Sequence, residues 1–167
     1  ACLTLAEQWA GVSQEPAAVP CMEESVLSFL RSCEVLTSDW KQMLEQAANA
    51  PEPENLLAYT PALDQEIRLF TMDMLYRYYL RAAYAETPEA EILPLQMAAF
   101  SVCVVLLYSR RLGFHTAEQR LRIWQLFVKE IEYDENNLEE LEWQLETNAA
   151  FSPAAFRAYF ASPGGVQ

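Results

Sequence analysis

Glycine is scarce in this sequence, and its scarcity excludes one class of ligand site. Only four glycines occur among 167 residues, and Gly113, Gly164 and Gly165 fall where helices should end. Glycine-rich loops that bind phosphates or dinucleotides are therefore absent from the sequence.

Histidine and cysteine are too few and too scattered to build a metal site. The single histidine, His115, has no cysteine or histidine at ligand spacing, and Cys2, Cys21, Cys33 and Cys103 form no CxxC pair. We therefore predict no metal site within this chain. Scattered cysteines in a helical protein indicate reduced thiols and a cytoplasmic location, and no signal peptide is visible.

Positive charge is also scarce. Eleven lysines and arginines oppose 24 aspartates and glutamates, which gives a net charge of −13 at pH 7. A chain with this charge repels nucleic acid and anionic lipid head groups, so we expect neither nucleic acid nor a membrane as a partner. Arg110, Arg111, Arg120 and Arg122 form the only basic cluster, which we interpret as a solvated helix end.

The sequence does contain a helical apolar pattern with clear helix boundaries. Apolar residues make up 52% of the chain, and no stretch alternates long enough for a strand. Thr60, Thr87 and Ser152 each precede a proline as helix caps, and Thr116 with Gln119 matches a capping box. These boundaries predict an all-α, irregular helical bundle of about seven helices, at roughly 3–10, 22–34, 38–49, 62–85, 89–112, 117–147 and 153–161.

The chain length fits a single helical domain, residues 1–167. We expect N-terminal helices in residues 1–50, with a loop at 14–20, then a linker at 51–60 and a helical core in 61–161. The sequence opens with Ala1 rather than methionine, so we expect a fragment of a longer protein.

Two helices are predicted at the centre of the bundle. The helix at 62–85 is apolar on two opposite sides, which is typical of a helix that is covered on both. One side carries Ile67, Phe70, Met74 and Tyr78, and the other carries Leu69, Tyr76 and Leu80. The stretch 92–108 is apolar nearly all round, and we predict a buried core helix there rather than a membrane span. Their short connection favours antiparallel packing.

The predicted helix 117–147 has two interpretations that the sequence leaves open. Arg77 and Arg81 lie at the edge of an apolar stripe, where each must reach water or a carboxylate. If the helix 117–147 is continuous, Glu135 lies within its apolar stripe and pairs with one of these arginines. If residues 134–137 break the helix, because aspartate and asparagine are poor helix formers with good capping chemistry, Glu135 lies in solvent.

A group of tyrosines and a group of glutamates are each interpreted as structural rather than as part of a binding site. The tyrosines of residues 76–84 are interpreted as core packing, with their hydroxyls at polar rims. The glutamates of residues 139–146 are interpreted as a solvated face.

Two segments of the chain resemble one protein family. LYRYYLRAAY, residues 75–84, resembles the tyrosine- and arginine-rich helix in the C-terminal half of the flagellin lysine-N-methylase (FliB-like) family. KEIEYDENNL, residues 129–138, resembles the second C-terminal motif of that family, an REIEHSDENL-like stretch, in the same order and spacing. Tyr133 stands where the family pattern usually has histidine, and Asn136 is an additional polar residue in the motif. The family's cysteine-rich N-terminal region is not in this chain.

The resemblance implies the helical C-terminal domain of a bacterial lysine N-methyltransferase whose substrate is a protein such as flagellin. It implies support for substrate engagement or for the missing cysteine-rich, metal-chelating region, and whether this chain takes part in catalysis stays open. No cofactor is expected within the chain; metal and S-adenosylmethionine would belong to the full-length protein. The candidate polar cluster comprises Tyr76, Arg77, Tyr78, Arg81, Glu130, Glu132, Asp134, Glu135 and Asn137.

The alternative function is a non-enzymatic helical module for protein–protein interaction, which binds through an exposed apolar groove. A self-contained enzyme is disfavoured, because the sequence places no second acid, histidine or nucleophile to work with Glu135.

Overall fold

The structure is a computed structural model that describes residues 19–51, 57–58, 60–84 and 88–161. These residues form helices and connecting loops and contain no strand, which confirms the predicted all-α bundle. The α-helices are α2 (Val19–Ser32), α3 (Ser38–Asn49), α4 (Pro61–Ala83), α5 (Pro88–Leu112), α6 (Ala117–Phe127), α7 (Glu135–Thr147) and α8 (Pro153–Ala161). A π-helical turn, η1 (Val128–Glu132), follows α6, and a 3₁₀ turn, η2 (Ala149–Phe151), follows α7.

Most helix boundaries lie within a few residues of the predicted ones. The helix α2 begins at Val19, so the end of the predicted loop 14–20 is helical. The predicted helix 3–10 lies outside the described residues, and so do residues 52–56 and 59 of the predicted linker 51–60. The predicted helix 117–147 consists of two α-helices separated by η1.

The predicted caps are present where the structure describes them. The hydroxyl of Thr60 accepts a hydrogen bond from the Leu63 amide at 3.1 Å. Thr116 and Gln119 form the reciprocal capping box at the start of α6. Gly113 has a φ of +65°, the left-handed conformation that ends α5 at little steric cost. Local chemistry therefore sets the helix ends as the sequence indicates.

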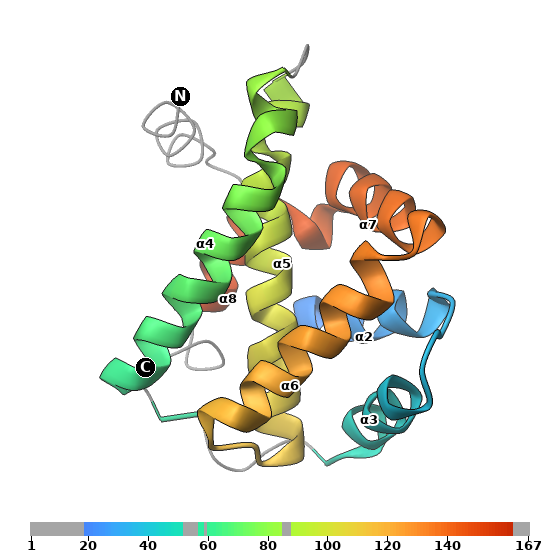
Figure 1. Cartoon of the computed structure of the whole chain (residues 1–167), viewed down its shortest axis with the longest axis vertical. Helices are drawn as coiled ribbons and strands as arrows, with labels where there is room; N and C mark the ends of the chain where they lie inside the picture. Colours follow the sequence, from blue (N-terminus) through green and yellow to red (C-terminus); the bar gives the residue numbers. More distant parts are fainter. Residues whose placement is uncertain (1–18, 52–56, 59, 85–87, 162–167) are drawn as a thin grey trace.

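The helix α5 is the centre of the bundle. It contacts each of the other described α-helices, and α4 runs antiparallel to it (Figure 1). By length and composition Glu91–Leu112 is apolar enough to cross a bilayer, but 89% of its most apolar window is buried inside the protein. This agrees with the predicted core helix.

Aromatic side chains fill the space around α5. The ring of Phe100 lies 5.5 Å from Phe29 of α2 and 5.2 Å from Phe151 of η2, both edge-on. Trp40 of α3 stacks on Tyr108 with ring centroids 5.3 Å apart. The N-terminal helices therefore share one core with the C-terminal ones.

The helix α4 lies at the edge of the bundle, and the prediction that it is covered on both sides is wrong (Figure 1). Its inner side buries Leu63, Phe70, Met74 and Tyr78. Its opposite side leaves large apolar side chains exposed: Leu69, Met72, Tyr76, Tyr79 and Leu80, which we call the outer stripe. The interpretation of the tyrosines as core residues holds for Tyr78 but is wrong for Tyr76, Tyr79 and Tyr84, which are 85%, 49% and 82% exposed.

The break between α6 and α7 decides between the two interpretations of Glu135. The carboxylate of Asp134 accepts a hydrogen bond from the Asn137 amide at 2.8 Å and caps α7. Glu135 is exposed in the first turn of α7, where a negative charge suits the helix dipole. The pairing of Glu135 with an arginine is therefore wrong, because η1 and the cap reset the helical phase.

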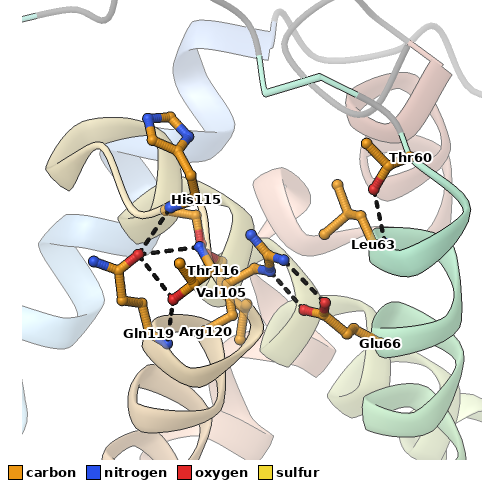
Figure 2. Close-up of polar contacts among 9 residues, drawn as sticks. Thr60, Leu63, Glu66, Val105, His115, Thr116, Gln119 and Arg120 are labelled. Atoms are coloured by element: carbon orange, nitrogen blue, oxygen red, sulfur yellow. Dashed lines mark hydrogen bonds and ion pairs between the residues drawn. The ribbon is translucent and has the colours of Figure 1, made fainter.

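The basic cluster is not a solvated helix end. Arg110 and Arg111 have side chains that are 5% and 7% exposed, and both reach Glu23 of α2. Arg120 of α6 meets Glu66 of α4 through two parallel hydrogen bonds of 2.6 and 2.9 Å (Figure 2). Arg122 forms an exposed pair with Asp39. Arg110, Arg111 and Arg120 join helices because burial forces each of these cations to find a carboxylate.

The buried Arg120–Glu66 pair generates a prediction for stability. Glu66→Ala should lower the free energy of unfolding by about 3 kcal/mol, because it leaves Arg120 buried without a partner. Glu66→Leu combined with Arg120→Met should lie within about 1 kcal/mol of the native chain, since the pair is replaced by apolar packing. Urea unfolding followed by circular dichroism measures both.

The matched control is the exposed pair of Arg68 and Asp64 on the same helix. Arg68→Ala should change the free energy of unfolding by less than about 1 kcal/mol. An equal effect of Glu66→Ala and Arg68→Ala would contradict the assignment of Arg120–Glu66 as the pair that holds α4.

Candidate functional site

The structure divides the nine residues of the candidate cluster into separate groups. Arg77 and Glu132 meet in an ion pair between α4 and η1. Glu130, Asp134 and Asn137 form a hydrogen-bonded group on the other side of η1. Tyr78 is buried, whereas Tyr76 and Glu135 are exposed and apart from both groups. The side chain of Arg81 lies outside the described residues.

The ion pair joins the two segments that carry the family resemblance. Arg77 Nη1 lies 3.1 Å from Glu132 Oε2, and Arg77 Nε lies 2.9 Å from Asp73 Oδ2 one helical turn earlier. The Arg77 side chain is 38% exposed, whereas that of Glu132 is only 8% exposed. The prediction that Arg77 reaches water or a carboxylate therefore holds, but the carboxylate is Glu132, and the predicted pairing with Glu135 is wrong.

The surroundings of Glu132 perturb its carboxyl group. Burial raises the pKa of Glu132 above its ordinary value, and the charge of Asp73 adds to this, while Arg77 opposes it. Its Oε1 is buried and has no hydrogen-bond partner. The pKa of Arg77 is raised, since burial lowers it but Glu132 and Asp73 outweigh that effect. Glu132 thus carries an electrostatic cost that the fold does not fully compensate.

Glu130 and Asn137 hold the connection between α2 and α3. The fully buried carboxylate of Glu130 accepts hydrogen bonds from the Leu36 amide at 2.7 Å and from the Thr37 hydroxyl. The side-chain amide of Asn137 accepts from the Glu34 amide and donates to the carbonyls of Glu34 and Glu130, each at 2.8 Å. These side-chain groups satisfy backbone amides and a carbonyl of the connection that have no partner within a helix.

The arrangement of these groups does not support covalent catalysis. The Thr37 hydroxyl donates to Glu130, but its oxygen accepts from the Trp40 amide as the cap of α3, so it is not free to attack a substrate. Burial raises the pKa of Cys33 to about 12, with Glu140 and Asp134 adding to the effect, and burial also raises the pKa of Cys103. Both thiols therefore stay protonated at neutral pH.

Metal-ligating side chains and two surface hollows are the other candidates for a site among the described residues. No group of three histidine, cysteine, aspartate or glutamate side chains in these residues lies close enough to hold a metal ion. A groove of about 390 Å³ between α2 and α7 is lined by three serines together with Glu24, Phe29, Gln144 and Asn148. Its Asn148 and Gln144 side-chain amides bond to each other. An apolar hollow of about 200 Å³ between α4, α5 and α8 is smaller than typical ligand pockets.

The feature that sequence reasoning missed is the outer stripe of α4. Among the described residues, eleven large apolar side chains are exposed, and five of them form this stripe on one helix face. Exposed apolar residues that occur singly are normal, but a contiguous row marks an interaction surface. The signal was visible in the sequence as the second apolar side of residues 62–85, which we had assigned to the core.

The raised pKa of Glu132 generates a prediction for pH dependence. Arg77→Ala should lower the free energy of unfolding by about 1–2 kcal/mol at pH 7, because a buried carboxylate loses its main cation. A carboxyl group whose pKa is raised in the folded state favours folding when protonated, and that contribution is lost as pH rises through the folded pKa. The loss caused by Arg77→Ala should therefore shrink between pH 7 and pH 5.

The control for this prediction is Glu132→Gln, which removes the titrating group. Relative to Glu132→Gln alone, the Arg77→Ala/Glu132→Gln double variant should lose the same free energy of unfolding at pH 7 and at pH 5. A loss in Arg77→Ala that is equal at both pH values, or larger at the lower one, would mean that Glu132 does not carry the effect.

Comparison with protein-family models, with curated proteins and with solved structures gives no match to this chain.

Proposed function

We propose that this chain is a non-enzymatic protein-interaction module whose contact surface is the outer stripe of α4. The observation that carries the proposal is the exposure of Leu69, Met72, Tyr76, Tyr79 and Leu80, which ranges from 49% to 85% along one face. The same helix is well covered on its inner side, so the exposure belongs to that face alone.

The energetics favour a partner on this face. Burying a leucine, methionine or aromatic side chain gains roughly 1.5–3 kcal/mol relative to leaving it exposed. Two tyrosines in the row add rigid side chains with few rotatable bonds, a type that is enriched in binding hot spots. A partner helix laid along α4 would therefore gain several such contacts at a modest cost in side-chain entropy.

The charges beside the outer stripe suit an apolar contact. The chain as a whole carries a net charge of −13. Along α4, however, Asp64 pairs with Arg68, and Asp73 pairs with Arg77. Glu66 is likewise neutralised by Arg120. The acidic residues that flank the stripe thus have nearby cations, which lowers the repulsion against an approaching partner.

A photo-crosslinking amino acid placed at Tyr76 tests the proposal in cells that express the full-length protein. Irradiation should give an adduct of one defined mass, because the side chain at position 76 lies in the middle of the contact surface. The matched control is Tyr133, which is 76% exposed between η1 and α7 and lies outside the stripe. Adducts that are absent at position 76, or equally abundant at position 133, would overturn the proposal.

We propose as the second candidate the helical domain of a FliB-like lysine N-methylase, with a role in substrate engagement or in support of the cysteine-rich region. The observation that favours it is the contact between the two resembling segments, which meet through Arg77 and Glu132. A second support is the acidic surface of α7, where Glu139, Glu140 and Glu146 are exposed. Such a surface attracts lysine-bearing proteins.

Titration of the chain with flagellin, followed by calorimetry, tests substrate engagement. We expect binding that weakens at least about tenfold from low to high salt, because the attraction is electrostatic. Glu139→Gln/Glu140→Gln/Glu146→Gln should weaken it in the same direction, and Glu45→Gln on α3 serves as a control at another exposed acid. No binding by this chain, with full binding by the cysteine-rich region, would remove the substrate-engagement role.

A further inference from the structure

The outer stripe follows the spacing of a coiled-coil seam. Leu69, Met72, Tyr76 and Tyr79 are separated by three, four and three residues, which are the a and d positions of a seven-residue repeat. Ala83, exposed at the end of α4, continues the series. A row with this period can pack along one other helix, at roughly 20° to it. The spacing therefore lets a second helix follow the stripe along its length, and the residues beside the stripe identify which helix fits.

The residues beside the seam complement a second copy of themselves. Arg68 and Leu75 occupy the g positions, and Asp73 and Leu80 occupy the e positions. In a parallel pair of helices a g residue meets the e residue five positions later on the partner. Arg68 then faces Asp73 of the other copy, and Leu75 faces Leu80 of the other copy. One contact joins opposite charges and the other joins apolar side chains, and the two-fold symmetry makes each of them twice.

We infer that α4 of two copies of this chain pair in parallel and in register through the outer stripe, forming a two-fold symmetric dimer. This inference rests on the proposed interaction function of the same surface and names its partner.

The geometry of the edge helix permits this pairing. The outer face of α4 is exposed, so a two-fold axis along this face places the two bundles on opposite sides of the seam. The Arg68 side chain is 76% exposed and donates its Nε to Asp64, so other guanidinium donors face solvent. The Asp73 side chain is 41% exposed. Both groups can therefore reach across a seam.

The apolar area is adequate for a stable pair. At these exposures the five side chains of the outer stripe present roughly 600 Å² of accessible surface per copy. This area approaches the ~800 Å² that each partner buries in a standard interface. Two chains of charge −13 repel each other, so they can associate only where the surface is locally neutral. The stretch of α4 flanked by its ion pairs meets this condition.

Sedimentation equilibrium of the 167-residue chain tests the dimer. The mass should approach twice 19.1 kDa as the concentration rises. Tyr76→Glu should weaken the association more than about tenfold, because it buries two carboxylates in the seam. The control Tyr133→Glu adds the same charge at an exposed position and should leave the association unchanged. Circular dichroism verifies that both variants remain folded.

Charge exchange tests the parallel register. Arg68→Glu alone and Asp73→Lys alone should each dissociate more readily than the native dimer, because each homodimer then places like charges together. A mixture of the two variants should associate about as well as the native chain, since a mixed dimer restores both opposite-charge contacts. Met72→Cys should form a disulfide between its two copies under mild oxidation, whereas Tyr133→Cys should add none beyond the native chain.

The outcomes separate the pairing from the proposed function. Three results would overturn the parallel pairing. They are a native chain that stays monomeric, a Tyr76→Glu variant that still dimerises, and a mixture of the Arg68→Glu and Asp73→Lys variants that associates no better than either variant alone. If the adduct formed at position 76 contains a different protein and the chain is monomeric, the interaction function stands and the pairing is wrong. If position 76 gives no adduct at all, both are wrong.

Discussion

The turn between α6 and α7 is the constraint on which the arrangement of the bundle depends. Glu130 and Glu132 lie two residues apart in η1 and point to different sides of it, since residues i and i+2 of a helix do not face each other. Glu130 binds the connection between α2 and α3, and Glu132 binds Arg77 of α4. One short segment therefore fixes both the N-terminal helices and the edge helix to the centre.

The helix α4 needs these ion pairs because its packing is one-sided. It buries its inner side mainly against α5, while its outer face has no partner within the described part of the chain. The pairs with Arg120 and Glu132 lie at its rim, at two points along its length. Partly buried ion pairs contribute little net stability but fix geometry, since a misplaced helix would leave charges buried and unpaired. The position of the outer stripe relative to the bundle is thus well defined.

The helices and their ends were predictable from sequence because they depend on local chemistry. Thr60, Thr116 and Gly113 act on residues within one turn, so their roles can be identified without knowing the fold. The break at residues 134–137 was visible as a possibility for the same reason. Only the structure shows that the helix breaks there, since the choice between a continuous helix and a capped break depends on which side chains each of them buries.

The candidate site was predictable only in part because burial depends on distant neighbours. The second apolar side of α4 has the composition of a core face, and nothing local distinguishes a core face from an interface. The four arginines between 110 and 122 likewise look like a solvated cluster until Glu23 and Glu66 are brought beside them. Sequence periodicity identifies apolar faces and charged residues but not what covers them.

The departure of Tyr133 from the family pattern can be weighed against these contacts. Tyr133 is 76% exposed and lies between Glu132 and the Asp134 cap, so its side chain takes part in neither the Arg77 pair nor the Asn137 group. A histidine at this position would also face solvent. The residues that touch α4 and the α2–α3 connection are Glu130, Glu132 and Asn137, and these positions agree with the resembling motif. Tyr133 is therefore not among the residues whose contacts order the bundle.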